Sequence, residues 1–82
     1  TKADADDWRD VDRDLFERLR AMRMQVARKR GVPPYVIFHD TTLREIARTK
    51  PDTVEGLRHV KGVGDRKAAD LGELILSLIP SP

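Results

Sequence analysis

Residues 31–40, GVPPYVIFHD, interrupt a chain whose flanking segments have helical patterns. The run YVIF at 35–38 has strand-forming side chains, yet two prolines precede it and the chain offers no second strand to pair with. Because the prolines favour an extended or 3₁₀ turn, we expect the segment to cross a helical bundle and to bury Ile37 and Phe38. Tyr35 is then either a core ring or an exposed ring at the edge of the turn.

Upstream of this turn, apolar residues recur every three or four positions, as on one face of a helix. Aspartates precede the pattern and suit its N-cap, whereas three basic residues followed by Gly31 suit its C-terminal end. We therefore expect one helix from about residue 7 to residue 30. Its apolar face would consist of Trp8, Val11, Leu15, Leu19, Met22 and Val26, widened by Phe16.

Two short helices are expected after the turn. The first has Asp40 or Thr42 as its N-cap, with Thr42 and Glu45 spaced as a capping box, and ends before Pro51. The second has Asp52 and Glu55 as its capping box and ends near Lys61. Its inner face would consist of Val54, Leu57 and Val60.

A long C-terminal helix completes the expected order and ends at Pro80. Gly72 lies inside it, which indicates close approach by a neighbouring helix, since glycine otherwise costs a helix about 1 kcal/mol relative to alanine. The fold class is therefore all-α, a compact bundle of four to five helices. The apolar face of the last helix would consist of Ala68, Leu71, Ile75 and Leu78, thickened by Leu74 and Ile79.

The length of 82 residues is that of one small domain. Without cysteine, neither a disulfide nor a thiolate metal site can stabilise it. With 37% charged residues and no apolar run long enough to span a bilayer, we expect a soluble chain that does not enter a membrane. The acidic N-terminus does not resemble a signal peptide.

The formal net charge of +2 is unevenly distributed. Residues 1–14 contain six aspartates against three basic residues, whereas residues 18–39 contain six basic residues and no acid. The chain therefore begins with an acidic head and turns basic just before the proline turn.

Catalytic and metal-binding residues are not expected. His39 and His59 lie twenty residues apart and lack the spacing of a zinc site, so surface or capping roles are favoured. The aspartates of residues 4–14 lack the glycine and terminal glutamate of a calcium loop, and acids at a helix start are commoner. We expect no cofactor and no small-molecule substrate.

Nucleic-acid binding is better supported, because it requires basic side chains on one surface and, for single strands, an aromatic ring on which a base stacks. Arg28, Lys29 and Arg30 lead directly into Tyr35. The alternative is that these charges only complement the helix dipole, and that Arg20 forms an ordinary surface pair with Glu17.

A second basic patch surrounds the sequence HVKGVGDRK at 59–67, where the Gly-Val-Gly turn leads into a helix. Free backbone N–H groups and the helix dipole make such a turn a natural phosphate site. The alternative is that Gly64 is a simple N-cap. The basic residues of this patch are Arg58, Lys61, Arg66 and Lys67.

These segments, in this order, resemble the HRDC domain, which occurs at the C-terminus of RecQ-type DNA helicases and of ribonuclease D. The resemblance is carried by LFERLRAMRMQVARKRGVPPYVIFHDTTLREIA at 15–47, by Pro51, and by LRHVKGVGDRKAADLGELILSLI at 57–79. It covers about four fifths of the chain. VPPYVIF at 32–38 is more similar to the RecQ branch than to the ribonuclease D branch.

The resemblance implies a non-catalytic helical module that binds single-stranded or branched DNA and modulates the helicase core of its own chain. VPPYVIF suggests a bacterial protein, for which the resemblance implies nucleoid association in the cytoplasm; in a eukaryote it implies a nuclear location. We expect the isolated domain to be monomeric. Tyr35 corresponds to the tyrosine of the single-strand site, and Lys67 to the lysine after the glycine turn. The remaining expected DNA contacts are Arg28, Lys29, Arg30, Lys61 and Arg66.

The acidic head departs from the HRDC pattern and would repel DNA. We expect residues 1–14 to be a linker and helix start, and residues 15–80 to be the domain proper. The alternative is that the head docks on a basic surface of the helicase, so that the module acts through interdomain contact with little DNA binding. The acidic candidates are Asp6, Asp7, Asp10 and Asp14.

Overall fold

Asp12 sets the start of the first long helix. The structure, a computed structural model, describes residues 7–80. The Asp12 carboxylate accepts a hydrogen bond from the Leu15 backbone N–H at 3.0 Å and caps α2 (Arg13–Arg30). Gly31 ends α2 in the left-handed conformation (φ 67°), as expected.

The expected start of this helix at about residue 7 is wrong. Asp10 has a φ of 60°, and the Val11 N–H donates to the Trp8 carbonyl in a turn at 3.2 Å. The turn reproduces the three-residue spacing of a helical face, which is why the apolar pattern was misleading. Trp8 still packs edge-on against Phe16, with ring centroids 4.8 Å apart.

The segment after Gly31 forms one α-helical turn, α3 (Pro34–Ile37), rather than an extended or 3₁₀ turn. Pro34 occupies the first helical position, where its missing N–H costs nothing, and its carbonyl accepts from the Phe38 N–H at 3.3 Å. Ile37 and Phe38 are buried, as expected. Tyr35 is 61% exposed, so the core alternative for this ring is excluded.

The next helix, α4 (Asp40–Thr49), ends before Pro51 as expected, but its predicted capping box is wrong. Its N-cap is His39, so both expected caps, Asp40 and Thr42, lie inside the helix, and the Thr42 N–H donates to the His39 carbonyl. The Thr42 hydroxyl instead donates to the carbonyl of Lys61 at 3.2 Å. This bond ties α4 to the turn before the last helix.

The short helix α5 (Val54–Arg58) is capped by Thr53 and not by Asp52. The Thr53 hydroxyl accepts from the Gly56 N–H at 2.9 Å, whereas Asp52 lies one residue too early to cap. The helix ends at Arg58 and not near Lys61, because turns replace it from there.

The last helix, α6 (Gly64–Leu78), ends before Pro80 as expected. Val63, and not Gly64, is its N-cap residue. Leu74, expected on the core face, is 42% exposed because it lies at the edge of the apolar stripe. The close approach predicted at Gly72 is confirmed, since a Cβ there would lie 3.3 Å from a methyl group of Val54 in α5.

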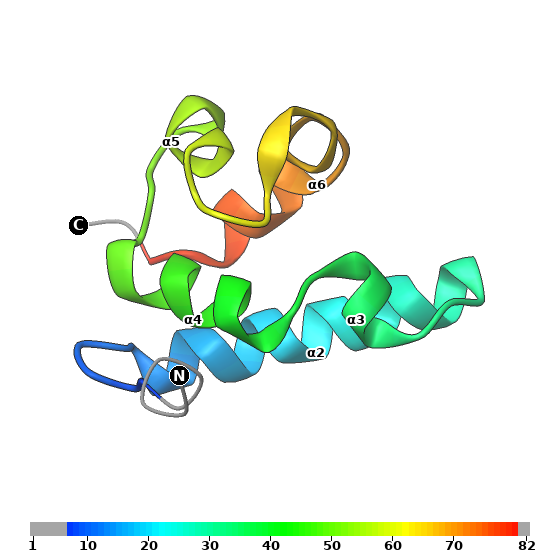
Figure 1. Cartoon of the computed structure of the whole chain (residues 1–82), viewed down its shortest axis with the longest axis horizontal. Helices are drawn as coiled ribbons and strands as arrows, with labels where there is room; N and C mark the ends of the chain where they lie inside the picture. Colours follow the sequence, from blue (N-terminus) through cyan, green and yellow to red (C-terminus); the bar gives the residue numbers. More distant parts are fainter. Residues whose placement is uncertain (1–6, 81–82) are drawn as a thin grey trace.

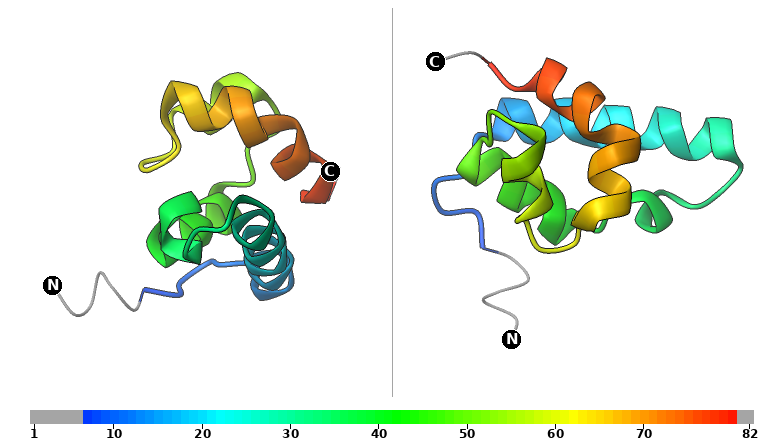
Figure 2. Two further views of the ribbon diagram at one scale, coloured as in Figure 1. Left: turned by 90° about the vertical axis from the view of Figure 1, so that its right-hand side faces the viewer. Right: turned by 90° about the horizontal axis from the view of Figure 1, so that it is seen from above.

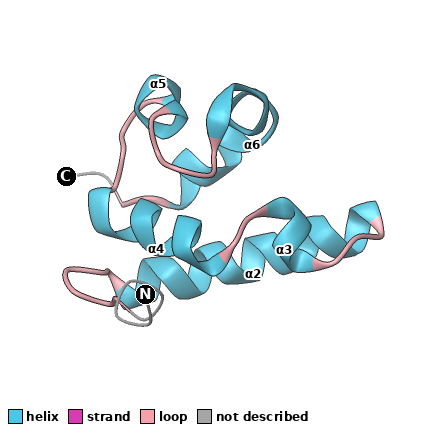
Figure 3. Cartoon of the chain, viewed as in Figure 1, coloured by secondary structure: helices cyan, strands magenta, loops and turns pink. Residues whose placement is uncertain are grey.

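The helices form two layers (Figures 1 and 2). In one layer α3 and α4 pack against α2, and in the other α5 packs against α6. All regular structure within residues 7–80 is helical (Figure 3), which confirms the all-α fold class, and none of these helices is long and apolar enough to cross a membrane. The largest fully buried side chains come from both layers: Phe38, Leu15, Leu19, Leu43, Ile46, Leu57 and Ile75.

We predict that Gly62→Ala destabilises the fold more than Gly64→Ala. Both glycines have positive φ, 96° and 66°, so an alanine at either position costs about 1–2 kcal/mol. A Cβ at Gly62 would also lie 2.1 Å from the buried Thr42 hydroxyl oxygen, whereas Gly64 has open space. Losing the bond from Thr42 to Lys61 raises the expected total for Gly62→Ala to about 2–4 kcal/mol.

Urea unfolding of the two variants measures this difference. Equal losses would show that the contact between Thr42 and Gly62 does not constrain the turn.

Candidate nucleic-acid interface

The one-turn helix α3 lies between two hollows that basic residues line. The first, of about 620 Å³, is called the tyrosine hollow; the second, of about 210 Å³, is called the lysine hollow. Pro34 and Tyr35 face the former, Val36 and Ile37 the latter. The tyrosine hollow is lined by Arg23, Pro34, Tyr35, His39, Asp40, Thr41 and Arg44. The lining of the lysine hollow includes Arg30, Val36, Ile37, Arg66, Lys67 and Asp70.

The lysine hollow brings together three of the expected DNA contacts from two helices, namely Arg30, Arg66 and Lys67. Arg66 is exposed, whereas Lys67 is half-buried, with its ammonium nitrogen 5.2 Å from the centroid of the Phe38 ring. This cation–π contact holds the lysine over the core residue next to α3.

Arg30 is not available as a simple phosphate ligand. Its guanidinium donates two hydrogen bonds to the Asp70 carboxylate, at 2.7 and 2.8 Å, and so links the end of α2 to α6. These hydrogen bonds raise the pKa of Arg30 and lower the pKa of Asp70 from their ordinary values. A phosphate that approaches Arg30 must compete with Asp70.

The tyrosine hollow contains three functional candidates that the sequence reasoning missed: Arg23, His39 and Arg44. Arg23 is 9% exposed, and its Nη1 donates to the Phe38 carbonyl at 3.0 Å and to the Asp40 carboxylate at 2.7 Å. Its buried Nε has no hydrogen-bond partner among the described residues. The feature of the sequence that could have indicated burial of Arg23 is its place directly after Met22, on the inner face of α2.

The other two residues reach the hollow from the start of α4. Arg44 is buried, with its guanidinium 5.1 Å from the centroid of the Trp8 ring. His39 is exposed and directly precedes α4. Its position four residues after Tyr35 is the sequence pattern that could have drawn attention to it.

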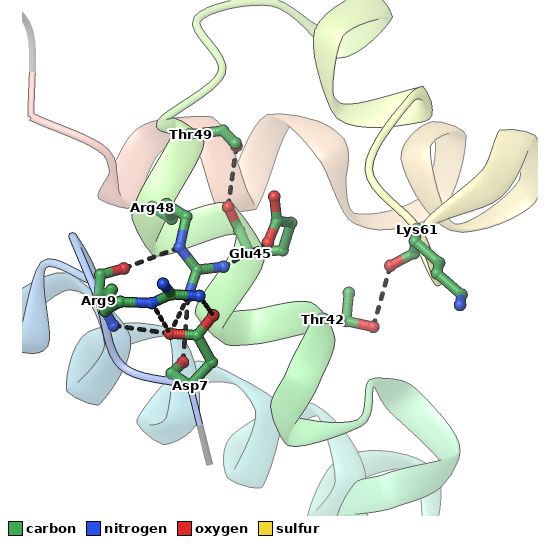
Figure 4. Close-up of polar contacts among 7 residues, drawn as sticks. All are labelled: Asp7, Arg9, Thr42, Glu45, Arg48, Thr49 and Lys61. Carbon is green, nitrogen blue, oxygen red and sulfur yellow. Dashed lines mark hydrogen bonds and ion pairs between the residues drawn. The ribbon is translucent and has the colours of Figure 1, made fainter. Parts of the chain in front are cut away.

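Lys61 belongs to a third hollow, of about 850 Å³, between α4 and the turn that precedes α6. We call it the α4 groove. Its lining includes Glu45, Thr49, His59 and Lys61, and it shares His39 and Thr41 with the tyrosine hollow. The bond from Thr42 to the Lys61 carbonyl fixes this turn beside α4 (Figure 4).

Other expected basic contacts lie elsewhere. Arg28 and Lys29 are exposed at the end of α2 and line none of the three hollows. Arg58 donates to Asp65 at 2.8 Å and to Glu55 at 2.6 Å, and the bond to Asp65 raises its pKa. Arg58 is therefore committed to its own helix and the start of α6.

The acidic head is partly neutralised by the fold. Arg9 donates hydrogen bonds to the Asp7 carboxylate, which hold the pKa of that carboxyl well below its ordinary value. Arg48 of α4 donates to the backbone carbonyls of Asp7 and Arg9, at 3.0 and 2.8 Å (Figure 4). Residues 7–9 are thereby attached to α4.

The remaining acidic candidates differ in their state. Asp6 lies outside the described residues. Asp10 and Asp14 are exposed. Asp12, another aspartate of the head, is the N-cap of α2, and its carboxylate pairs with the ammonium of Lys50 at 3.1 Å. The hydrogen bond from the Leu15 N–H is the larger cause, and the pair with Lys50 the smaller, of a lowered pKa of Asp12.

Two further expectations concern ions. The surface pair between Glu17 and Arg20 is confirmed, at 3.1 Å. Within residues 7–80, no three side chains of the usual metal-binding types are grouped as a metal site.

Comparison with known proteins gives one family and several relatives. A family model described as the HRDC domain matches residues 12–79. The chain is 46% identical over 66 residues to the ATP-dependent DNA helicase RecQ of Bacillus subtilis (strain 168). This match covers 80% of this chain and 11% of the helicase. It is 41% identical over 68 residues to RecQ of Haemophilus influenzae, which covers 83% of this chain and again 11% of the helicase.

A solved structure is also similar. "D. radiodurans RecQ HRDC domain 3" has a TM-score of 0.77 and 35% sequence identity, and the match covers 80% of this chain and 87% of that one. The chain thus spans nearly all of a solved domain but only about a tenth of the curated helicases.

We predict that Arg23→Ala destabilises the fold by about 2–4 kcal/mol, because it leaves the buried Phe38 carbonyl without its donor. Arg20→Ala is the matched control on the same helix. Its exposed pair with Glu17 contributes about 0–1 kcal/mol. Chemical denaturation compares the two variants, and similar losses would contradict the structural role of Arg23.

Proposed function

This chain belongs to the HRDC domain family, and on that basis we propose that it is a non-catalytic accessory module of a larger DNA helicase. We propose that it binds single-stranded or branched DNA and modulates how the helicase core of the same chain engages its substrate. The observation that carries the proposal is the exposed ring of Tyr35, located on a turn between two hollows that basic side chains line.

The side chains on the two sides of α3 match the two chemical parts of a DNA single strand, its phosphates and its bases. A single strand presents phosphates at regular intervals and bases whose faces are open for stacking. Arg66 and Lys67 supply positive charge on one side of α3, and Tyr35 supplies a stacking surface on the other. Lys61 adds one positive charge to the α4 groove, whose lining also contains Glu45.

The acidic head gives less support to the alternative function, in which the module acts through interdomain contact with little DNA binding. Asp7 is engaged by Arg9 and Arg48. Among the described candidates, Asp10 and Asp14 are the exposed ones. A docking role for the head in the full helicase would therefore depend on these two residues and on Asp6.

We predict different salt responses for Tyr35→Ala and Lys67→Ala. Loss of stacking should weaken binding to a single strand by about 1–3 kcal/mol without changing the salt dependence. Loss of Lys67 should reduce the slope of log affinity against log salt by about 0.7, the value for one phosphate on a single strand. Fluorescence anisotropy across a salt series measures both quantities.

Arg20→Ala is the control for this experiment, because Arg20 is exposed, pairs with Glu17 and lines none of the three hollows. A flat salt response of the original chain, or unchanged affinity in both variants, would reject direct binding. If binding is negligible while charge reversal at Asp10 alters the full-length helicase, the interdomain function is favoured instead.

We also predict that Asp70→Asn strengthens binding to a single strand by a few-fold, because it releases Arg30 from a pair that is exposed and therefore weak. The salt slope should become steeper by about 0.7 if Arg30 then contacts one more phosphate. Glu73→Gln is the matched control, since it removes one exposed negative charge from the same helix. Equal gains in the two variants would indicate a general charge effect and not the release of Arg30.

A further inference from the structure

Tyr35 and His39 place two exposed rings side by side at the mouth of the tyrosine hollow. Their ring centroids are 6.4 Å apart and their planes differ by 24°, in a stacked arrangement. Tyr35 is 61% exposed, and His39 is also exposed. Both rings line the same hollow.

Two near-parallel rings on neighbouring side chains hold a flat molecule between them once their planes are far enough apart. Carbon atoms in contact are about 3.5 Å apart, so a planar group between two parallel rings requires about 7 Å from ring to ring. The centroid distance of 6.4 Å is an upper limit on the present separation of the ring planes, so the two exposed side chains rotate apart to admit a flat group.

The backbone under the two rings is fixed. Ile37 and Phe38, which lie between them in the chain, are 5% and 1% exposed, and Arg23 holds the Phe38 carbonyl. The core therefore sets the distance between the backbone positions of Tyr35 and His39. Binding a ligand between the two rings then requires ordering of these two side chains only.

The surroundings favour a negatively charged ligand that continues beyond the rings. Asp40, the acid beside the rings, is paired with Arg23. Because the tyrosine hollow and the α4 groove share His39 and Thr41, a path leads from the rings past Thr41 to Lys61. Glu45, the acid along that path, is paired with Arg48.

We propose that Tyr35 and His39 clamp one unpaired nucleobase between their rings, with the strand continuing past Thr41 to Lys61. This inference rests on the proposed function and makes it more specific. In a duplex both faces of a base are covered by its neighbours, so a two-sided clamp requires an unstacked base and selects single strands over duplex. His39 is then a specificity-determining residue and not a neutral surface imidazole.

The test compares affinities of the 82-residue chain for an oligothymidylate and for an abasic strand with the same number of phosphates. His39→Ala should weaken binding to the oligothymidylate about five- to tenfold and leave binding to the abasic strand unchanged. His39→Phe keeps a ring and should restore the affinity, whereas His39→Gln should not. His39 makes no side-chain capping bond, so these variants should fold, which circular dichroism checks.

Each other result overturns the clamp. An equal loss on the abasic strand would show a phosphate contact instead of stacking, and failure of His39→Phe to restore affinity would show that the ring is not what matters. Binding by the original chain with no effect of His39→Ala would reject the clamp alone. No binding of either strand by the original chain would reject the proposed function as well.

Discussion

The burial of Ile37 and Phe38 is the constraint on which the rest of the structure depends. These two residues attach α3 to the core, and with them inside, Tyr35 must face outward. Arg23 binds the Phe38 carbonyl from below, while Lys67 lies over the Phe38 ring. Phe38 therefore supports the turn with its buried side chain, orders Arg23 with its backbone carbonyl and positions Lys67 with its ring, at the proposed binding surface. Fully burying such a side chain contributes about 1.5–3 kcal/mol, which gives the turn its fixed place.

Pairing within the fold decides which charges remain to attract a partner. A net charge of +2 says little about this, because several arginines are already bound to acids of the same chain. Arg30 is held by Asp70, and Arg48 by the acidic head and Glu45. The exposed basic residues of the proposed surface are consequently fewer than the sequence suggests. Within residues 7–80, Arg66 and Lys67 in the lysine hollow and Lys61 in the α4 groove form the part of the proposed surface that is not paired with an acid in this way.

Sequence patterns predicted the helices well where the pattern reflects the burial of apolar residues. They predicted poorly which residue is the N-cap of each helix. The order of the helices, the glycine end of α2 and the packing of α5 on Gly72 follow from spacing and backbone chemistry. Asp12 and Thr53 could not be chosen as caps, because several polar residues compete at each of these helix starts, and Val63 could not because it caps α6 without a side-chain hydrogen bond. The site was predicted in part for a related reason. Tyr35 and Lys67 lie in recognisable motifs, whereas Arg23 and His39 join the surface only through the fold.

In the proline turn, two buried residues lie between exposed ones, and this arrangement has a consequence for how the surface can change. Residues 37 and 38 determine where the backbone lies, and residues 35 and 39 carry the exposed rings. In the proposed function, exchanging Tyr35 and His39 alters what the surface recognises and leaves the packing of residues 37 and 38 unchanged. In that function, affinity and stability are therefore encoded by separate positions within five consecutive residues, so that new binding preferences can be selected in this turn at little structural risk.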